Sequence, residues 1–406
     1  MMHVSPEIYL PTEIVLHIVG IVAADESRRQ ETLHACCLVS RQWYSAAIAP
    51  LYEKPHVGTG VAFGKFTDTI SPPIGARKSK LNLGSLVHRL DLSGLVHHSS
   101  NSLTARLLGR VKENLEVFIA PRVSFSTNSL PALSKCTNLR SLDLSLVGDP
   151  IPFTNLKQAL SRLRKLNTLR LPQSTSLTSA ESTSPSTTAV EWPPEITRLQ
   201  LSGRFNPLTI PTFAWPASLT SLSLKNCADL SVSNLGSLLS SPHLNHSLRR
   251  FSISGANRGL QPESINAILA FLPGLTTLSV PGDMVDDTFF DILCHMAPPV
   301  ALEELEFAHP SQDPSLVFST EALIRALGCG LRDLRAVGFA DIFCTEQRIN
   351  EDEELEEILL KRVAERPDPP EHWKEDEHLL PTGKDPYILP ASRDSSDEQA
   401  RKKGDG

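Results

Sequence analysis

The stretch Leu139-Arg140-Ser141-Leu142-Asp143-Leu144 decides the fold, because its pattern L-x-x-L-x-L returns along most of the chain. With conservative replacements the pattern occurs ten times, and its fourth position falls at residues 90, 118, 142, 169, 199, 222, 251, 278, 305 and 334. Successive copies are 23 to 30 residues apart. One copy alone would mean little, but nine similar intervals indicate an internal repeat.

Each copy predicts a short strand. Positions four and six of the pattern lie on the same face of a strand, because side chains alternate between its two faces. One such strand cannot bury its apolar face alone, whereas stacked copies in a parallel sheet build a continuous core. Apolar residues at helical spacing lie between the copies, for example over 287–296 and 320–327, so each strand is expected to continue into a right-handed crossover.

This pattern and period resemble the leucine-rich repeat. The resemblance implies an α/β solenoid, a horseshoe of about ten repeats over residues 86–345. Residues 53–85 would form an irregular first repeat or linker. At the ninth position of the repeat the family commonly carries Asn or Cys, whose side chain satisfies the turn backbone. Cys227 fits this pattern, while Asp283 and Pro310 depart from it.

A separate module over residues 8–52 precedes the repeats. Its first predicted helix begins at Pro11 and Thr12 and carries apolar residues on nearly every side, and shorter helical stretches follow around Leu33 and Trp43. A helix that is apolar all round must be covered all round, and two short helices cannot do this. The surplus apolar surface predicts either docking on the repeats or a partner protein.

The sequence of this module resembles an F-box. Leu10-Pro11-Thr12-Glu13-Ile14 is similar to its L-P-x-E-I/L start, Val39-Ser40-Arg41-Gln42-Trp43 to its V-C/S-K/R-x-W centre, and Pro50-Leu51-Tyr52 to its tail. The resemblance implies a substrate-recognition subunit of a Skp–cullin–F-box E3 ubiquitin ligase. Its F-box would bind the Skp adaptor and, through it, a cullin, and its repeats would hold a protein substrate. It implies no catalytic residue in this chain.

The same resemblance assigns adaptor binding to seven residues, namely Leu10, Pro11, Ile14, Ile18, Leu38, Val39 and Trp43. A second interpretation places Trp43 inside the three-helix module only. A leucine-rich-repeat scaffold or regulator that acts outside the ligase remains the alternative function.

The repeat period also predicts the face that meets a substrate. Four consecutive repeats place a basic residue beside an inward Leu or Phe, namely Arg170, Arg198, Lys225 and Arg250. Neighbouring strands lie ~4.8 Å apart, so these side chains are expected to form one patch for an acidic or phosphorylated segment. A solvated face without a ligand is the alternative interpretation.

Acidic residues concentrate near the end of the chain. Residues 350–381 hold twelve Asp and Glu against four Lys and Arg, which gives this stretch a net charge of −8. Since the whole chain has a net charge of −7, the remaining residues together carry +1. Because the residues outside this stretch are nearly neutral in sum, they argue against a nucleic-acid partner. Residues 346–381 are predicted to cap the last repeat. A second interpretation has the acidic stretch fold onto Arg170–Arg250.

Two segments lack the composition of a core. Residues 173–194 contain eleven Ser and Thr in twenty-two positions and predict a flexible loop, and residues 382–406 predict a disordered tail.

The seven cysteines are odd in number and include no C-x-x-C pair, which disfavours a disulfide framework or structural zinc. Cys294-His295 lacks further ligands at metal-binding spacing, and Cys329 and Cys344 have no identifiable His partner. We therefore expect no metal and no cofactor. The apolar run near the N-terminus is interrupted by Pro11 and Glu13, so we expect no membrane span and a cytoplasmic or nuclear protein.

Overall fold

The structure, a computed structural model, describes residues 10–25, 27–72, 81–95, 101–177, 191–205, 213–227, 229–313, 315–347 and 352–365. The chain divides into two compact units. Unit 1 comprises Met1–Ser174 and Ser186–Ile196, and unit 2 comprises Thr175–Pro185 and Thr197–Gly406.

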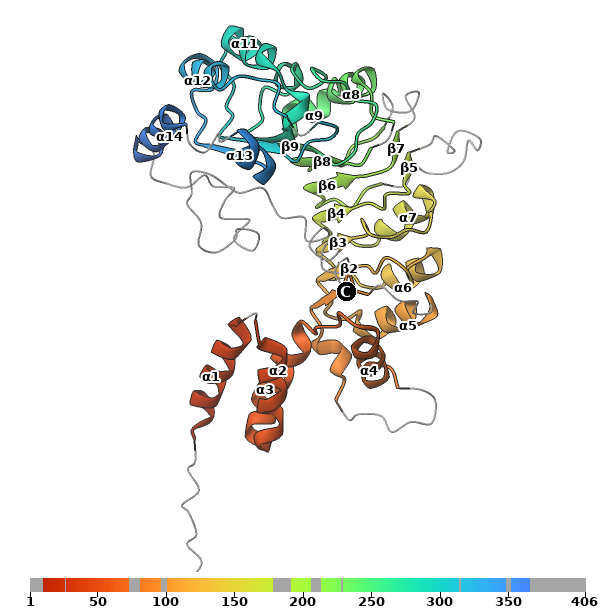
Figure 1. The fold of residues 1–406 in the computed structure, drawn as a ribbon. Helices are drawn as coiled ribbons and strands as arrows, with labels where there is room; N and C mark the ends of the chain where they lie inside the picture. The colour runs from red at the N-terminus through yellow and green to blue at the C-terminus, as the bar shows by residue number, and fades with distance from the viewer. Residues whose placement is uncertain are drawn as a thin grey trace, which may run out of the picture. The chain divides into compact units, whose positions relative to one another are not determined.

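Unit 1 begins with three helices, α1 (Thr12–Ala24), α2 (Arg29–Val39) and α3 (Arg41–Glu53) (Figure 1). Their shared core is formed by buried apolar side chains, including Val15, Val19, Leu33, Ala47 and Leu51. Ser40 separates α2 from α3 in extended backbone, and its Oγ accepts the N–H of Trp43 at 3.3 Å. This N-cap makes the junction sharp, so that α3 turns back along α2.

The chain leaves α3 along the edge of the first strand. The N–H of His88 donates to the Glu53 carbonyl at 3.0 Å, and His56 forms an isolated parallel bridge with Asp91. Residues 53–56 thus supply partners for an edge that would otherwise expose unpaired backbone groups. Helix α4 (Gly60–Ile70) follows, with Thr59 as its N-cap.

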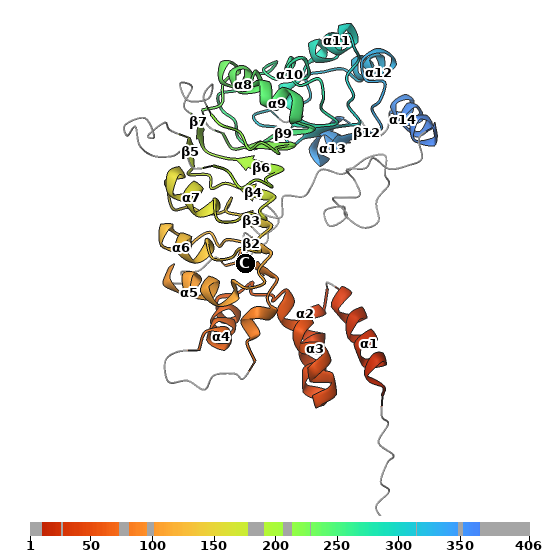
Figure 2. The same ribbon diagram turned by 180° about the vertical axis from the view of Figure 1, so that it is seen from behind.

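Four parallel strands of unit 1 lie side by side in chain order, and Figures 1 and 2 show the intervening helices α5, α6 and α7 along one side of them. The strands are β1 (Arg89–Asp91), β2 (Val117–Ile119), β3 (Ser141–Asp143) and β4 (Thr168–Arg170). The helical segments are η1 (Leu83–Leu86), α5 (Asn101–Val111), η2 (Thr127–Ser129), α6 (Leu130–Leu133) and α7 (Phe153–Leu160).

Six further parallel strands in chain order build unit 2. They are β6 (Arg198–Leu201), β8 (Ser221–Lys225), β9 (Arg250–Ser254), β10 (Thr277–Pro281), β11 (Glu304–Ala308) and β12 (Ala336–Phe339). The helical segments are α8 (Val232–Leu239), α9 (Pro242–Ser247), α10 (Ile268–Phe271), η5 (Gly282–Met284), α11 (Asp287–His295), α12 (Thr320–Cys329) and α13 (Asp341–Gln347). Parallel strands alternating with helices confirm the predicted leucine-rich-repeat class in each unit.

The fourth position of the repeat forms a buried row across each sheet. In unit 2 the register aligns Leu199, Leu222, Phe251, Leu278 and Leu305, and all five side chains are buried. Burying an apolar side chain of this size contributes ~1.5–3 kcal/mol, so each added strand covers the apolar face of its neighbour.

The last predicted repeat was misaligned. Leu305 pairs with Val337 rather than with Leu334, and the buried pair of the final strand is Val337 and Phe339. The pattern therefore begins at Leu334, three residues later than predicted. Leu331 and Leu334 both fit its first position, and only pairing with β11 decides between them. Asp333 and Arg335 consequently precede the strand.

Asp283 departs from the Asn or Cys of the family pattern, yet its side chain satisfies turn backbone. Its carboxylate is buried, and Oδ1 accepts the N–H of Ser311 at 2.8 Å while Oδ2 accepts those of Gln312 and Asp313 at 2.7 and 3.0 Å. Asp283 thus satisfies the turn of the next repeat, as the Asn of regular repeats is expected to do. Asn257 acts similarly from the tenth position of its repeat instead of the ninth. Its Oδ1 accepts the N–H of Cys227 at 2.9 Å.

The Ser- and Thr-rich segment is not entirely loop. Ser176–Leu177 forms strand β5, which pairs in parallel with β7 (Arg204–Phe205) in unit 2. At its other end, in unit 1, Trp192 packs against Phe153 with ring centroids 5.7 Å apart and lies under the Lys157 ammonium at 5.4 Å. Composition does not predict these contacts, because one of them is backbone pairing and the other depends on a single aromatic side chain. Residues 178–190 lie outside the described part of the chain.

A final helix, α14 (Glu353–Glu365), packs at the end of unit 2 beside α12. Leu355 and Leu359 are buried, and Arg362 Nη1 donates to the carbonyls of Leu331 and Leu334 at 2.6 and 2.8 Å. Arg362 Nη2 donates to the Leu327 carbonyl. These bonds satisfy one carbonyl in the last turn of α12 and two carbonyls between that helix and the last strand. The remainder of the predicted cap and the predicted tail, residues 366–406, lie outside the described residues.

We predict that Asp283→Ala lowers the free energy of unfolding of the chain by ~3 kcal/mol, because three backbone N–H groups lose a buried charged acceptor. Chemical denaturation followed by circular dichroism measures the shift. The isosteric Asp283→Asn keeps one acceptor oxygen and is expected to lose about half as much. Equal stability of Asp283→Ala and the unmodified chain would contradict the assigned role.

Candidate functional site: an apolar helix end and the polar face of the second sheet

The first candidate surface is one end of the α1–α3 module. The start of α1, the end of α2 and the start of α3 meet there, because Gln42 Nε2 donates to the Leu10 carbonyl at 2.9 Å and to Thr12 Oγ1 at 3.1 Å. One amide side chain on α3 therefore fixes where α1 begins. Apolar residues near these three helix ends are brought onto a common surface.

The structure exposes most of the predicted adaptor residues. Leu38 and Val39 are 75% and 65% exposed, Ile14 and Leu10 are 47% and 36% exposed, and Pro11 is exposed. Ile18 is half-buried. Trp43 is also half-buried and packs against the core cluster of the three helices, so part of its ring serves the module itself.

Sequence reasoning missed three exposed apolar side chains of the same module. Leu16, Ile21 and Tyr44 are 52%, 61% and 38% exposed. For Leu16 and Ile21 the sequence held a signal, because the first helix was predicted to be apolar on nearly every side. The F-box pattern names only part of that circumference, and only the packing of α2 and α3 shows which sides they leave uncovered.

The second candidate surface is the side of the unit 2 sheet that bears the polar strand residues. Register places Arg198, Ser221, Arg250, Thr277 and Glu304 in one row across β6, β8, β9, β10 and β11. The next row is Gln200, Ser223, Ser252, Ser279 and Glu306. This face, named here the polar face, carries cations over its first three strands, hydroxyls between, and carboxylates on β11.

The four predicted basic residues do not form one uniform patch. Arg198 and Arg250 share a row with Ser221 between them, while Lys225 lies four residues further along β8, at the other end of that strand. Arg170 belongs to unit 1, where its Nη1 pairs with Asp143 Oδ2 at 3.0 Å. That ion pair offsets part of the charge of Arg170.

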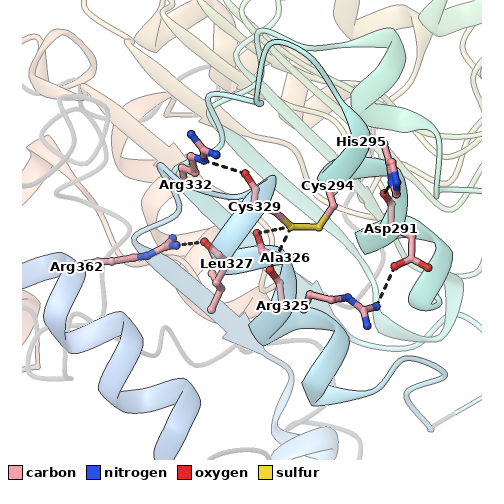
Figure 3. The surroundings of a disulfide bond; sticks show 9 residues. All are labelled: Asp291, Cys294, His295, Arg325, Ala326, Leu327, Cys329, Arg332 and Arg362. Carbon is pink, nitrogen blue, oxygen red and sulfur yellow. Dashed lines mark hydrogen bonds and ion pairs between the residues drawn. A yellow bond between two sulfur atoms is a disulfide. The ribbon is translucent and has the colours of Figure 1, made fainter.

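The cysteines were expected to provide no disulfide framework, but the structure contains one bridge within the described residues. Cys294 at the end of α11 is bonded to Cys329 at the end of α12 (Figure 3). Arg325 on α12 also pairs with Asp291 on α11 at 2.9 Å. The two cysteines are 35 residues apart, and only the stacking of consecutive repeats brings them together.

Three of the other described thiols are poorly suited to nucleophilic chemistry. Burial raises the pKa of Cys136 and of Cys227 to about 12. Burial and, to a smaller extent, the charge of Asp341 raise the pKa of Cys344. Since the thiolate is the reactive form, these environments suppress reactivity.

Two further classes of site were searched for. Within the described ranges, no three His, Cys, Asp or Glu side chains gather as a metal ion would require. The described helices include none with the length and apolar character needed to cross a membrane.

Comparison with known proteins agrees with the module and the repeats. No protein-family model matches the chain. It is 30% identical over 249 residues to F-box protein YDR306C of Saccharomyces cerevisiae, which covers 61% of this chain and 48% of that protein. It is 26% identical over 284 residues to protein pof5 of Schizosaccharomyces pombe, which covers 69% of this chain and 76% of that protein.

Among solved structures, the chain is similar to one in the yeast Rad7 and Elc1 complex, with 13% identity, a TM-score of 0.42, and coverage of 86% of this chain and 84% of that one. A chain of the Drosophila Toll–Spatzle complex has 12% identity and a TM-score of 0.29, and the match covers 62% of this chain and 39% of that one.

Its parallel strands alternating with helices define the class as a leucine-rich-repeat protein with an N-terminal helical module. More particularly, the chain is similar in sequence to an F-box protein of Saccharomyces cerevisiae, in agreement with the F-box resemblance of its sequence. Its match spans about half the length of the Saccharomyces relative.

We predict that Gln42→Ala loosens the first turn of α1, because Leu10 and Thr12 lose their bond to α3. Amide hydrogen exchange of residues 14–17 should accelerate by ~10-fold, the effect of losing about 1.4 kcal/mol of local stability. Arg41→Ala, which changes an exposed neighbour on the same helix, is the matched control. Equal protection in both variants would show that Gln42 does not hold this end of the module.

Proposed function

We propose that the chain is the substrate-recognition subunit of a Skp–cullin–F-box E3 ubiquitin ligase. The α1–α3 module binds the Skp adaptor, which connects it to a cullin, and the repeats hold a protein substrate for ubiquitination. The chain contributes no reacting group. It acts by raising the effective concentration of the substrate beside a ubiquitin-charged conjugating enzyme, in the cytoplasm, the nucleus or both.

The observation that carries this proposal is the exposed apolar end of the module. Leu38, at 75%, is the most exposed of the large apolar side chains on the described part of the chain, and Val39, Ile14 and Leu10 of the same module are 65%, 47% and 36% exposed. Several exposed apolar side chains on one small module are typical of protein–protein sites. Gln42 holds the helix ends in place, so little ordering is needed on binding. Homology to an F-box protein supports the Skp adaptor as the partner.

We predict that Leu38→Lys together with Val39→Lys weakens binding to the Skp adaptor at least ~30-fold, because interface hot spots contribute ~2 kcal/mol or more each. Isothermal titration calorimetry with purified adaptor measures the change. Both side chains face solvent, so the fold is expected to stay intact.

Val232→Lys is the matched control, since Val232 is 51% exposed on α8 in unit 2 and belongs to a different surface. Unchanged affinity of the Leu38 and Val39 variant would refute adaptor binding at this end. Binding of the adaptor without co-purification of a cullin would favour the alternative, a repeat scaffold that works outside the ligase.

For the substrate, we propose that Arg198, Lys225 and Arg250 on the polar face bind an acidic or phosphorylated segment. Arg170, which pairs with Asp143, lies in unit 1. Hydrogen bonds between guanidinium groups and carboxylates or phosphates are stronger than neutral ones, and hydroxyls on the intervening strands add further donors.

Arg198→Glu combined with Arg250→Glu is expected to reduce recovery of acidic substrates by ~10-fold, through repulsion where attraction existed. Proximity labelling in cells with the proteasome inhibited, followed by quantitative mass spectrometry, gives the recovery. Arg258→Glu, at an exposed position in the loop after β9, is a control that reverses one charge away from the polar face. Recovery of every substrate at the unmodified level would remove these residues from the site.

A further inference from the structure

Helices α11 and α12 of consecutive repeats pack side by side and are joined at three levels. At their starts, Asp287 Oδ1 of α11 accepts the N–H of Ser319, the N-cap of α12, at 2.8 Å. Near their middles, Arg325 Nη2 of α12 donates to Asp291 Oδ1 of α11 at 2.9 Å. These two noncovalent levels align the helices, and neither of them depends on the oxidation state of the cysteines that form the third.

The third level is the disulfide between Cys294, in the last turn of α11, and Cys329, the last residue of α12 (Figure 3). Their Cα atoms are 5.1 Å apart, within the range that a disulfide spans. The two backbones approach closely because Gly330 has no side chain, whereas a β-carbon there would overlap the carbonyl group of Leu293. Both cysteines are half-buried, so a dissolved oxidant or reductant can reach them.

The cap helix α14 is attached to the same segment of chain. Arg362 Nη2 donates to the Leu327 carbonyl in the last turn of α12, and Nη1 donates to the carbonyls of Leu331 and Leu334 at 2.6 and 2.8 Å. Cys329 lies between these acceptors in the sequence. A bond that ties Cys329 to α11 therefore also restrains the carbonyls to which α14 is bonded.

We propose that Cys294 and Cys329 form a reversible thiol–disulfide switch, which locks the last repeat and the α14 cap when oxidised and lets them open when reduced. The two cysteines are 35 residues apart in the sequence. A bridge across a loop of this length restricts the opened chain far more than the folded one, so it disfavours opening. The switch lies within unit 2 and does not depend on the binding of an adaptor or a substrate.

The oxidant is a small-molecule disulfide, namely glutathione disulfide. The thiolate of one cysteine attacks a sulfur of glutathione disulfide, which breaks its S–S bond and releases one glutathione thiolate. The second cysteine then attacks the protein sulfur of this mixed disulfide and releases the second glutathione thiolate. The two cysteines lose two electrons to glutathione disulfide, and their two protons pass to the released thiolates. Excess reduced glutathione reverses both steps.

The first test measures the oxidation state of the full-length chain across glutathione redox buffers. Free thiols are trapped with N-ethylmaleimide, and mass spectrometry identifies the peptides. The Cys294–Cys329 pair is expected to form as the buffer becomes oxidising and to open with dithiothreitol. Alkylation of both cysteines in every buffer, a persistent mixed disulfide with glutathione, or a bridge that dithiothreitol does not open would each overturn the proposal.

The second test asks whether the close approach of the two repeats positions the thiols. Gly330→Ala keeps both thiols but adds the β-carbon that overlaps Leu293, so the glutathione ratio at half-oxidation should shift at least ~10-fold toward oxidising buffer. Gly328→Ala, on the same helix, is the matched control, because a β-carbon there meets nothing within 4 Å. Equal midpoints for the two variants would overturn the role of this backbone contact.

The third test measures the effect on the cap by amide hydrogen exchange. In the oxidised chain, residues 320–329 and 353–365 are expected to exchange at least ~30-fold more slowly than in the reduced chain. Cys294→Ser and Cys329→Ser should each exchange like the reduced chain in both buffers. Cys344→Ser, which leaves the pair intact, should keep the difference. Equal exchange of the oxidised and reduced chains would overturn the locking of the cap.

Discussion

The structure depends on the requirement that each short strand bury its apolar face against the next copy. In unit 2 the strand register meets this requirement by aligning one buried row, namely Leu199, Leu222, Phe251, Leu278 and Leu305. The same register positions the turns that follow these strands. Each turn then leaves backbone N–H groups inside the protein that need acceptors. Asp283 and Asn257 supply them, so apolar stacking and buried polar bonds stabilise the same repeats.

The α1–α3 module presents the opposite case. Its three helices bury Val15, Val19 and Leu33 but have too few residues to cover the rest of α1 and the end of α2. Leu38 and Val39 stay in solvent, although burying each would be favourable. A repeat array that follows an incompletely covered module fits the proposed role, in which the module binds an adaptor and the repeats hold a substrate.

Charge divides the second unit in a similar way. The cations of β6, β8 and β9 and the carboxylates of β11 share one face. Because these charges lie on neighbouring strands of one sheet, their separation is set by strand spacing and not by flexible loops. The repeat register therefore determines the charge pattern of this face.

The sequence by itself determined the repeat, the strand at nine of ten predicted positions, and the residues of the F-box pattern, because these depend on local spacing of apolar side chains. It gave no means to choose between Leu331 and Leu334 as the start of the last repeat, since both fit and only pairing with β11 separates them. Pairing across repeats also decided that Asp283 satisfies a distant turn, that Cys294 meets Cys329, and that Asp143 neutralises Arg170. Each of these joins residues about one repeat apart, and a sequence read along the chain does not reveal which side chains stacking brings within bonding distance.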